Sequence, residues 1–402
     1  MENHRVNGSS SYKFKSDSSI KLTSTITSRA VRVLGLIITV LILGEYVLPI
    51  LYYYNWDVPA RRQNFDEMRI LLLSDPHVEG YSPALHHLNY ILQYDSDRYL
   101  RDNFRRAVSE VDPELVVILG DLLDRGSIAT DKEFVDSCAR FREIFLTSHN
   151  VPYFLIPGDN DIGGEGLDFI TEAKSSRFEE CFGNYTGAKV LSFVEVRSAT
   201  DGSVSRHLDK HWDVDNSGRL RIFISHRSII HFSRNDLREA TSARQSCLFV
   251  SGHNHHASLV RRVGSNGTVV PERLSVGTTN LDIHRCLNHS MKEDFVDAYG
   301  LSVPSCTYRS GYPKANAYMF LRVFRNQNVS VVILPIPNRY NAIFLYLFTF
   351  LIFLTYVALS HSRYAKRRVR VFLYFLVLMS ILLCIELLLT PSSQRFIRHS
   401  LF

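Results

Sequence analysis

Five short apolar segments of this chain each run directly into an aspartate or a histidine, and this repetition constrains the fold more than any other feature. The clearest segment is 116–119, Val-Val-Ile-Leu, which Gly120 and Asp121 follow. Consecutive apolar residues rich in β-branched side chains predict a buried strand. The other four segments run into Asp75 and His77, into Asp159, into His226, and into His253 and His255.

These polar side chains are predicted to converge on a metal site. The ends of neighbouring strands share one edge of a sheet, where open α/β sheets place their chemistry. Clustered carboxylates and imidazoles, without thiolates, suit hard to borderline divalent metals. A single pair such as Asp121 and Asp124 would fit a helix cap or a turn equally well. Five segments with the same ending favour a metal centre instead.

The composition allows a large core and gives no sign of nucleic-acid binding. The chain has 402 residues, a net charge of +6 and 46% hydrophobic residues, enough for one large or two ordinary domains. Its densest basic runs flank apolar segments, so the positive charge does not indicate a nucleic-acid partner. The first 30 residues are rich in Ser, Thr and Lys and are predicted to be disordered.

Three apolar segments, 31–54, 340–360 and 371–390, are long enough to cross a bilayer as helices. The first is too long and begins too late for a cleaved signal peptide. The basic residues before the first segment favour a cytosolic N-terminus, and the basic loop 361–370 is expected on the cytosolic side as well. We therefore predict a multi-pass membrane protein with a disordered cytosolic tail 1–30, a transmembrane helix 31–54, a lumenal domain 60–338, a transmembrane helix 340–360, a cytosolic loop 361–370, a transmembrane helix 371–390 and a lumenal tail 391–402.

Glycosylation sequons and cysteines agree with a lumenal middle domain. The sequons begin at Asn184, Asn266, Asn288 and Asn328, all within the predicted lumenal segment. Five of the six cysteines lie there too. We expect a disulfide between Cys286 and Cys306, with buried free thiols as the alternative.

The middle domain alternates helical and strand patterns, which predicts layered sheets with outer helices. Amphipathic helices are expected at 99–111, 131–146 and 165–182. Later strands are expected at 189–196, 259–263, 268–270, 317–324 and 330–334.

The order of the five motifs resembles that of the calcineurin-like metallophosphoesterases over about residues 68–285. The motifs are Asp-x-His, Gly-Asp-x-x-Asp, a turn similar to Gly-Asn-His-Asp, a lone His after a strand, and Gly-His-x-His. Segments 101–106, 140–145, 161–163 and 177–182 resemble the membrane-anchored subgroup of this family. Members of that subgroup remove ethanolamine phosphate from the glycan of GPI anchors in the early secretory pathway.

The resemblance implies an α/β fold, a four-layer metallophosphoesterase β-sandwich flanked by helices, and a centre with two divalent metal ions. The family favours Mn²⁺, and the ligand types also allow Fe²⁺ or Zn²⁺. By resemblance, one metal is held by Asp75, His77, Asp121 and His255. The second is held by the bridging Asp121 with Asp159, His226 and His253.

One turn departs from the family pattern. The family has Gly-Asn-His where this chain has Gly158-Asp159-Asn160. Asp159 adds a third ligand carboxylate, and Asn160 cannot act as a general acid at neutral pH. Asp124, which would orient the family's histidine, loses its partner.

Three explanations of this departure stay open. In the first, another group, such as His86 or His87, donates the proton. In the second, the leaving group needs little help. In the third, the domain binds its target without turnover. If the missing histidine matters, Asn160→His should raise turnover.

Arg125 and Arg227 each directly follow a predicted site residue, Asp124 and His226. Arginine suits bidentate phosphate binding, and an ordinary ion pair is the alternative for both. The predicted function is a membrane-anchored dimetal phosphodiesterase of the endoplasmic reticulum or Golgi that acts on a GPI-anchor glycolipid. Another phosphoesterase activity and a non-catalytic adaptor for GPI-anchored cargo are the alternatives. The sequence does not predict an oligomeric state.

Overall fold

The computed structural model describes residues 31–60, 66–81, 89–147, 151–199, 219–231, 248–263, 268–274, 277–281, 283, 296–309 and 316–360. The chain divides into two compact units. One unit contains Tyr52–Tyr340 and holds all the strands described below. The other contains the apolar segments that end at Leu51 and begin again at Asn341.

The first sheet has six strands in the order β10-β13-β12-β1-β2-β3. Strands β1, β2 and β3 are parallel to one another, and the remaining pairs are antiparallel. The bounds are β1 Glu67–Leu73, β2 Leu115–Leu119, β3 Tyr153–Ile156, β10 Gly277–Leu281, β12 Ala317–Phe324 and β13 Val329–Pro335. The parallel strands are buried along almost their whole length, as their continuous apolar sequences predict.

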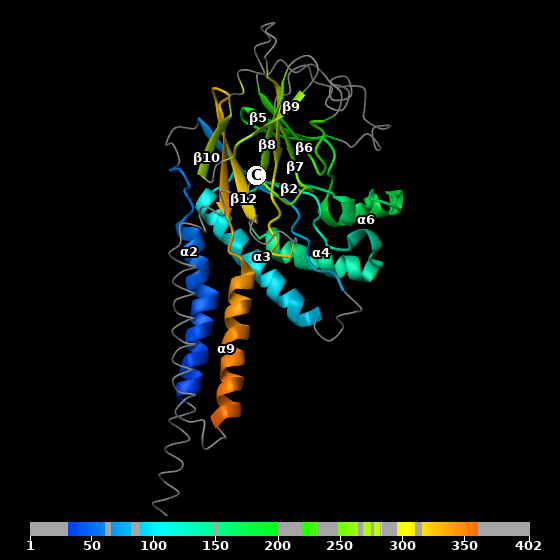
Figure 1. The fold of residues 1–402 in the computed structure, drawn as a ribbon. Helices are drawn as coiled ribbons and strands as arrows, with labels where there is room; N and C mark the ends of the chain where they lie inside the picture. The colour runs from blue at the N-terminus through cyan, green and yellow to red at the C-terminus, as the bar shows by residue number, and fades with distance from the viewer. Residues whose placement is uncertain are drawn as a thin grey trace, which may run out of the picture. The chain divides into compact units, whose positions relative to one another are not determined.

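The second sheet has seven strands in the order β4-β5-β6-β7-β11-β8-β9. Strands β5, β6, β7 and β11 are parallel, and the outer pairs are antiparallel. The bounds are β4 Ala188–Leu191, β5 Val194–Ser198, β6 Leu220–Ser225, β7 Leu248–Ser251, β8 Ser258–Val263, β9 Thr268–Glu272 and β11 Val296–Ser302. Both sheets are drawn in Figure 1.

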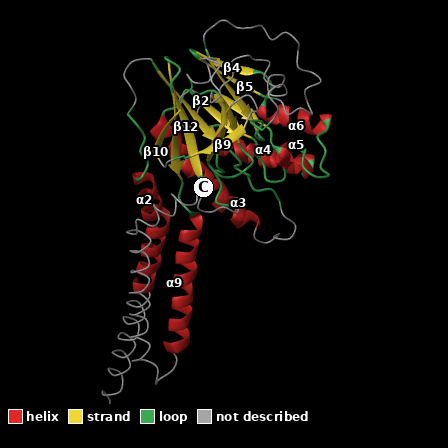
Figure 2. Cartoon of the chain, turned by 45° about the horizontal axis from the view of Figure 1, so that its top comes forward, coloured by secondary structure: helices red, strands yellow, loops and turns green. Residues whose placement is uncertain are grey.

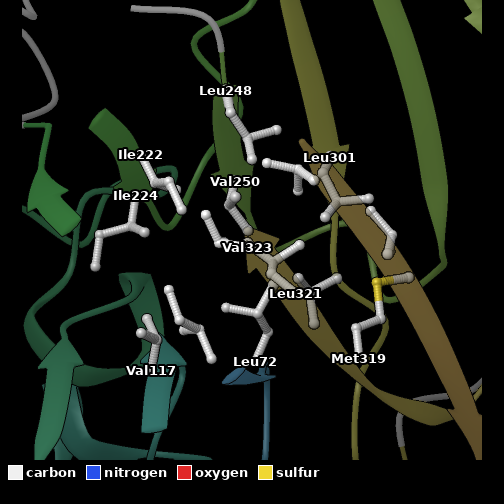
Figure 3. Packing of buried hydrophobic residues seen from close by; sticks show 14 of the residues in the cluster. Leu72, Val117, Ile222, Ile224, Leu248, Val250, Leu301, Met319, Leu321 and Val323 are labelled. Atoms are coloured by element: carbon white, nitrogen blue, oxygen red, sulfur yellow. The ribbon is translucent and has the colours of Figure 1, made fainter. Parts of the chain in front are cut away.

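The main core lies between the inner faces of the two sheets. Leu72 and Val117 of the first sheet pack in one cluster with Ile222, Val250 and Leu301 of the second. Figure 3 shows side chains from the two sheets meeting in this way. Successive residues of a strand point to opposite faces, so each parallel strand also supplies side chains to an outer core.

Helices cover the outer face of the first sheet. Helices α3 Asn89–Val111, α4 Asp131–Phe145 and α6 Glu172–Phe182 share a second apolar cluster with that sheet. Figure 2 shows α4, the short α5 Asp159–Ile162 and α6 together beside the strands. A one-turn 3-10 helix, η3 Gly126–Ile128, contacts α5. Three layers, one of helices and two of strands, are therefore established.

The fourth layer of the predicted sandwich stays a prediction. The outer face of the second sheet carries a small apolar cluster around Phe223 and Phe249. Among the described residues, no helical side chain belongs to this cluster.

The predicted disulfide is wrong. Cys138 of α4 is bonded to Cys181 of α6, with their Cα atoms 6.4 Å apart, and Cys306 is a buried free thiol. Both bonded cysteines lie on helices in the layer that covers the first sheet, where packing of α4 on α6 brings them together. Their spacing of 43 residues carries no signal of that contact.

The predicted helix 165–182 begins only at Glu172. Thr171 caps it by accepting a hydrogen bond from the Lys174 backbone N–H at 3.3 Å. The residues before the cap form a turn with a bridge between Glu165 and Asp168, and Gly163, Gly164 and Gly166 in this region have positive φ. The predicted strand 189–196 is divided into β4 and β5 by a turn. Strands β10 and β11 were not predicted.

Among the described residues, one helical segment, Val31–Tyr54, is long and apolar enough to cross a membrane. It includes a π-helical turn, η1 Leu43–Val47, followed by α2 Leu48–Tyr54. Helix α9 Arg339–Ser360 is the described part of the predicted C-terminal hairpin. In this unit the Tyr346 hydroxyl donates to the Glu45 carboxylate. The predicted segments 1–30 and 361–402 lie outside the described residues.

Candidate metal centre

Six of the seven predicted ligands lie in loops that follow strands, the seventh, Asp159, begins the short helix α5, and both sheets contribute. Asp75 and His77 follow β1, Asp121 follows β2, and Asp159 follows β3. From the second sheet, His226 follows β6, and His253 and His255 follow β7. Because these five strands are parallel within their sheets, their carboxyl ends open toward one place.

The structure brings these residues together as two groups that share Asp121. In each group, one ligand atom from every residue lies within 4.8 Å of all the others. The first group is Asp75, His77, Asp121 and His255, and the second is Asp121, Asp159, His226 and His253. Two adjacent sites with a common carboxylate are the arrangement that a pair of bridged divalent cations requires.

The first group is closely spaced. His77 Nε2 lies 3.2 Å from His255 Nε2 and 3.7 Å from Asp121 Oδ2. His255 Nε2 lies 3.5 Å from Asp75 Oδ1. Asp75 Oδ1 is buried and has no hydrogen-bond partner. A buried carboxylate oxygen without a donor is costly, and a cation in this group would satisfy it.

The second group is arranged around Asp159. Its Oδ1 lies 3.0 Å from His226 Nε2 and 3.2 Å from His253 Nδ1. His226 Nε2 also lies 3.5 Å from Asp121 Oδ1. The other nitrogen of His226, Nδ1, donates to the Leu119 carbonyl at 2.7 Å. That bond fixes the orientation of the ring, so that Nε2 is the nitrogen that faces the other ligands of the group.

Backbone strain is concentrated in these loops. Five of the seven non-glycine residues with positive φ among those described are candidate ligands: Asp75, His77, Asp121, His253 and His255. Left-handed backbone costs non-glycine residues energy and persists only where the surroundings hold it, typically at functional sites. The strained loops turn the side chains inward from the strand ends.

Two glycines allow the loops to approach each other closely. Gly120 has φ +90, and a Cβ there would collide with the His226 ring. A Cβ on Gly158 would collide with the Asp121 carboxylate and backbone N–H. Larger residues at either position would push the two groups apart.

The electrostatics of the centre favour a cation. Burial raises the pKa of Asp159, but hydrogen bonds from His226 and His253 outweigh it and hold that pKa well below its usual range. The pKa of Asp75 is lowered in the same way, because contacts with His255 and His226 outweigh burial. Burial lowers the pKa of His226, but Asp159, Asp121 and Asp75 raise it to about 10. The carboxylates therefore stay anionic and draw positive charge into the centre.

Asn160 has a role that the sequence did not indicate. Its backbone N–H donates to Asp121 Oδ1 and its side-chain Nδ2 donates to Asp121 Oδ2, both at 2.9 Å. Asn160 thus holds both oxygens of the shared carboxylate, which makes it a positioning residue.

Asp161, which was not predicted as a site residue, joins the loops after β2 and β3. Its carboxylate accepts from the backbone N–H groups of Leu122, Leu123 and Gly158 at 2.8–3.0 Å. Burial and the neighbouring Asp121 raise its pKa. The spacing Gly158-x-x-Asp161 is that of a capping box and could have suggested this role.

The remaining predicted site residues differ in their distance from the two groups. Asp124 Oδ1 lies 3.9 Å from His77 Nδ1, too far for a hydrogen bond. Arg227 Nη2 lies 3.5 Å from Asp159 Oδ1 and makes no hydrogen bond. Arg125 is exposed, and its aliphatic carbons pack beside Gly80. Arg227 therefore lies beside a ligand of the centre, whereas Arg125 is exposed beside Gly80. His86 and His87 lie outside the described residues.

Comparisons with known proteins agree with this geometry. The family model for calcineurin-like phosphoesterases matches residues 68–257. Metallophosphoesterase 1 of Danio rerio is 29% identical over 185 residues, which cover 45% of this chain and 46% of that protein. The Metallophosphoesterase 1 homolog of Drosophila melanogaster is 27% identical over 131 residues, which cover 32% and 34%. Cell division control protein 1 of Saccharomyces cerevisiae is 23% identical over 330 residues, which cover 73% and 66%.

The matched domain and the paired ligand groups support the class of metal-dependent phosphoesterases. Residues 68–257 match the calcineurin-like phosphoesterase domain, and the similar proteins are consistent with the Metallophosphoesterase 1 and Cdc1 subgroup. The chain spans less than half the length of the first two relatives that it matches.

Proposed function

We propose that this chain is a membrane-anchored phosphodiesterase with two divalent metal ions that removes ethanolamine phosphate from the glycan of GPI anchors. The observation that carries the proposal is the pair of ligand groups that share Asp121. Its resemblance to the membrane-anchored subgroup of the family supports the substrate. Mn²⁺ is the metal that the family favours, and the carboxylate and imidazole donors suit it.

The residues of the centre have separate roles in binding metal and phosphate. When bound, two divalent cations supply Lewis-acid stabilisation of the phosphoryl group and activate a water nucleophile. Asp75, His77 and His255 would hold one, Asp159, His226 and His253 the other, and Asp121 both. Arg227 Nη2, buried and without a hydrogen bond, is placed to bind a phosphoryl oxygen.

Three observations support a lumenal position for the domain, with the cytosol on the side of the N-terminus. The Cys138–Cys181 disulfide is stable in an oxidising compartment. Asn184 and Asn328, which begin two of the four sequons, are exposed. The apolar segment Val31–Tyr54 supports an anchor. Residence in the endoplasmic reticulum or Golgi rests on the family resemblance.

The test is metal content measured together with hydrolysis on the full-length chain in detergent. We expect about two metal ions per chain, cleavage of an aryl phosphodiester, and loss of both after chelation or in Asp121→Asn. A GPI glycan with its ethanolamine-phosphate branch should be cleaved faster than the aryl diester. Cleavage of the aryl diester alone would leave a phosphoesterase with another substrate, such as a lipid head group, a nucleotide or a phosphoprotein.

Asn160 gives a specific reason to keep a second candidate. The family's general acid is a histidine at this position, and Asn160 instead binds Asp121. A metal-binding adaptor for GPI-anchored cargo would need the two ligand groups but would not need a general acid. Two bound metals without turnover on any of these substrates would select the adaptor.

A further inference from the structure

Helix α3 carries a stripe of aromatic and basic side chains along one exposed face. Its members are separated by three or four positions, which places them one above another on a helix. In chain order they are Tyr90, Tyr94, Arg98, Arg101 and Arg105, with Ile91 beside the first two. This set is named the α3 stripe. Its first part is aromatic and its second part is basic.

The aromatic part is unusually exposed. Tyr90, Ile91 and Tyr94 expose 80%, 62% and 62% of their surfaces. Of the basic part, Arg105 is exposed and Arg101 is partly exposed. Within the described residues, neither of these two forms an ion pair with an acidic side chain. Arg98, between the two parts, lies 3.8 Å from Asp95 Oδ1. A contiguous exposed apolar patch followed by the exposed arginines Arg101 and Arg105 indicates a surface that binds something apolar and anionic.

The chain enters the domain at α3. Tyr53, near the end of the apolar segment Val31–Tyr54, donates from its hydroxyl to Asn103 Oδ1 at 2.9 Å. The Arg106 guanidinium lies 5.6 Å from the centroid of the Tyr53 ring. Both partners of Tyr53 belong to α3, so the first apolar segment joins the domain beside this helix.

The chain also leaves the domain at α3. Arg339, the first residue of the apolar helix α9, contacts Asp95 of α3, with Nε 3.1 Å from Oδ1. The Tyr99 hydroxyl of α3 donates to the Pro337 carbonyl at 2.8 Å. Within the domain unit, α3 therefore contacts the residues next to both points at which the chain continues into an apolar segment.

We propose that the α3 stripe lies on the surface of the lipid bilayer in which these two segments are anchored. Tyrosine is favoured at the boundary between headgroups and acyl chains, where its ring and hydroxyl meet different environments. Arginine forms bidentate hydrogen bonds with phosphate, which every phospholipid headgroup contains. The inference rests on the proposed function, since it needs the two apolar segments to enter a membrane.

Hydrogen bonds join helix α3 to the loop that carries His77, one of the candidate metal ligands. Gln93 of α3 donates to the Glu79 and Gly80 carbonyls at 3.4 Å. Arg140 donates to the Glu79 carbonyl at 2.7 Å and binds both carboxylate oxygens of Asp97 of α3 at 2.6 and 2.7 Å. Glu79 comes two residues after His77, so α3 braces the loop that carries this ligand. A helix held on the bilayer would therefore also position the loop that carries His77.

Fluorescence quenching tests this surface without any activity measurement. The full-length chain is reconstituted into phosphatidylcholine vesicles with phosphatidylinositol and brominated acyl chains. Tyr94→Trp should add fluorescence, beyond that of Trp56 and Trp212, that the brominated lipids quench. Val135→Trp is the matched control, because Val135 is 63% exposed on α4. Equal quenching at the two positions, or none at Tyr94→Trp, would overturn the proposal.

Charge reversal gives a second readout. Arg101→Glu with Arg105→Glu should lower the ratio of turnover on a lipid-linked diester in vesicles to turnover on a soluble aryl diester by about tenfold. Lys132→Glu, exposed on α4, is the control and should leave this ratio unchanged. An unchanged ratio in the double variant would count against the stripe. Quenching at Tyr94→Trp in a protein that hydrolyses no diester would refute the proposed function and leave the membrane surface standing.

Discussion

The two sheets contribute chemically different halves of the metal centre. The loops of the first sheet supply all three ligand carboxylates, from Asp75, Asp121 and Asp159, together with His77. The loops of the second sheet supply only imidazoles, from His226, His253 and His255. Neither sheet alone contains a complete group, so the centre exists only when the sheets are packed.

The halves also differ in burial and support. Asp75 and Asp121 are 0% and 2% exposed, whereas the side chains of His253 and His255 are 31% and 22% exposed. The carboxylates are held by backbone and side-chain donors, among them Asn160 and the His253 N–H. The first sheet is also covered by helices joined through a disulfide. The first sheet therefore supplies a firmly held anionic half, and the second supplies an imidazole half that is more accessible at His253 and His255 but buried at His226.

Removing the carboxylate that both ligand groups share should have the largest effect on the metal centre. Asp121→Asn should abolish binding of both metals and lower turnover by at least about 10³-fold, since each group loses its common ligand. His253→Asn, in the accessible half, should lose one metal and keep the other. Metal content by elemental analysis distinguishes the two variants. Two retained metals in Asp121→Asn would contradict the shared role.

Reduction of the disulfide tests the support of the first sheet. Cys138→Ser with Cys181→Ser should lower the free energy of unfolding by about 4 kcal/mol, the chain-entropy estimate for a bridge that closes a loop of this length. Cys306→Ala, at the buried free thiol, should lower stability only through lost packing. Reductant should destabilise this variant as much as it destabilises the parent protein. Thermal unfolding with and without reductant measures both effects. A parent protein that is insensitive to reductant would rule out this support.

Asn160 tests how the anionic half is held. Asn160→Ala removes the side-chain donor to Asp121 and should weaken metal affinity by roughly 10–100-fold, as loss of an outer-shell donor does. Asn160→His also removes the amide but restores the family's acid. Turnover at saturating metal separates positioning from proton donation: a rise in Asn160→His alone would show that the missing histidine limits catalysis. An unchanged metal affinity in Asn160→Ala would remove the positioning role.

The two arginines give the smallest expected difference. Arg227→Ala should weaken binding of inorganic phosphate by about tenfold, because its guanidinium lies beside Asp159. Arg125→Ala should change phosphate binding little, because Arg125 is exposed beside Gly80. Competition by phosphate against an aryl diester measures both. A larger loss in Arg125→Ala would reverse the assignment.

Much of the fold was predictable because it depends on local periodicity. The strand at 317–324 and the helix at 131–146 agree with β12 and α4 to within one residue. Strands β10 and β11 were missed because their sequences lack the alternation of apolar and polar residues that predicts a strand. These sequences are Gly-Thr-Thr-Asn-Leu and Val-Asp-Ala-Tyr-Gly-Leu-Ser. They form because neighbouring strands offer hydrogen-bond partners, which is a tertiary effect.

The arginine-rich segments of the family resemblance also acquire a physical meaning only in the structure. Arg142 donates to the Cys181 carbonyl at 2.6 Å, which joins α4 to α6. Arg177 lies 4.4 Å over the Phe134 ring and donates to the Gly126 carbonyl at 2.8 Å. Together with Arg140 they fasten the helices and loops around the first sheet. Their role is to hold the helices and loops around the metal centre, and they are not part of the ligand groups.

The sequence by itself indicated that Asp and His residues after five buried apolar strands converge, because the ends of parallel strands meet at one edge, and the family resemblance implied which seven are ligands. It also indicated the family and the apolar segments. Only the tertiary structure decided that Asn160 holds Asp121, that Cys138 pairs with Cys181, and that Arg227 rather than Arg125 faces the ligands. Those contacts join segments far apart along the chain or depend on side-chain direction in irregular loops. Neither periodicity nor spacing carries that information, since it arises from how the two sheets and their helices pack.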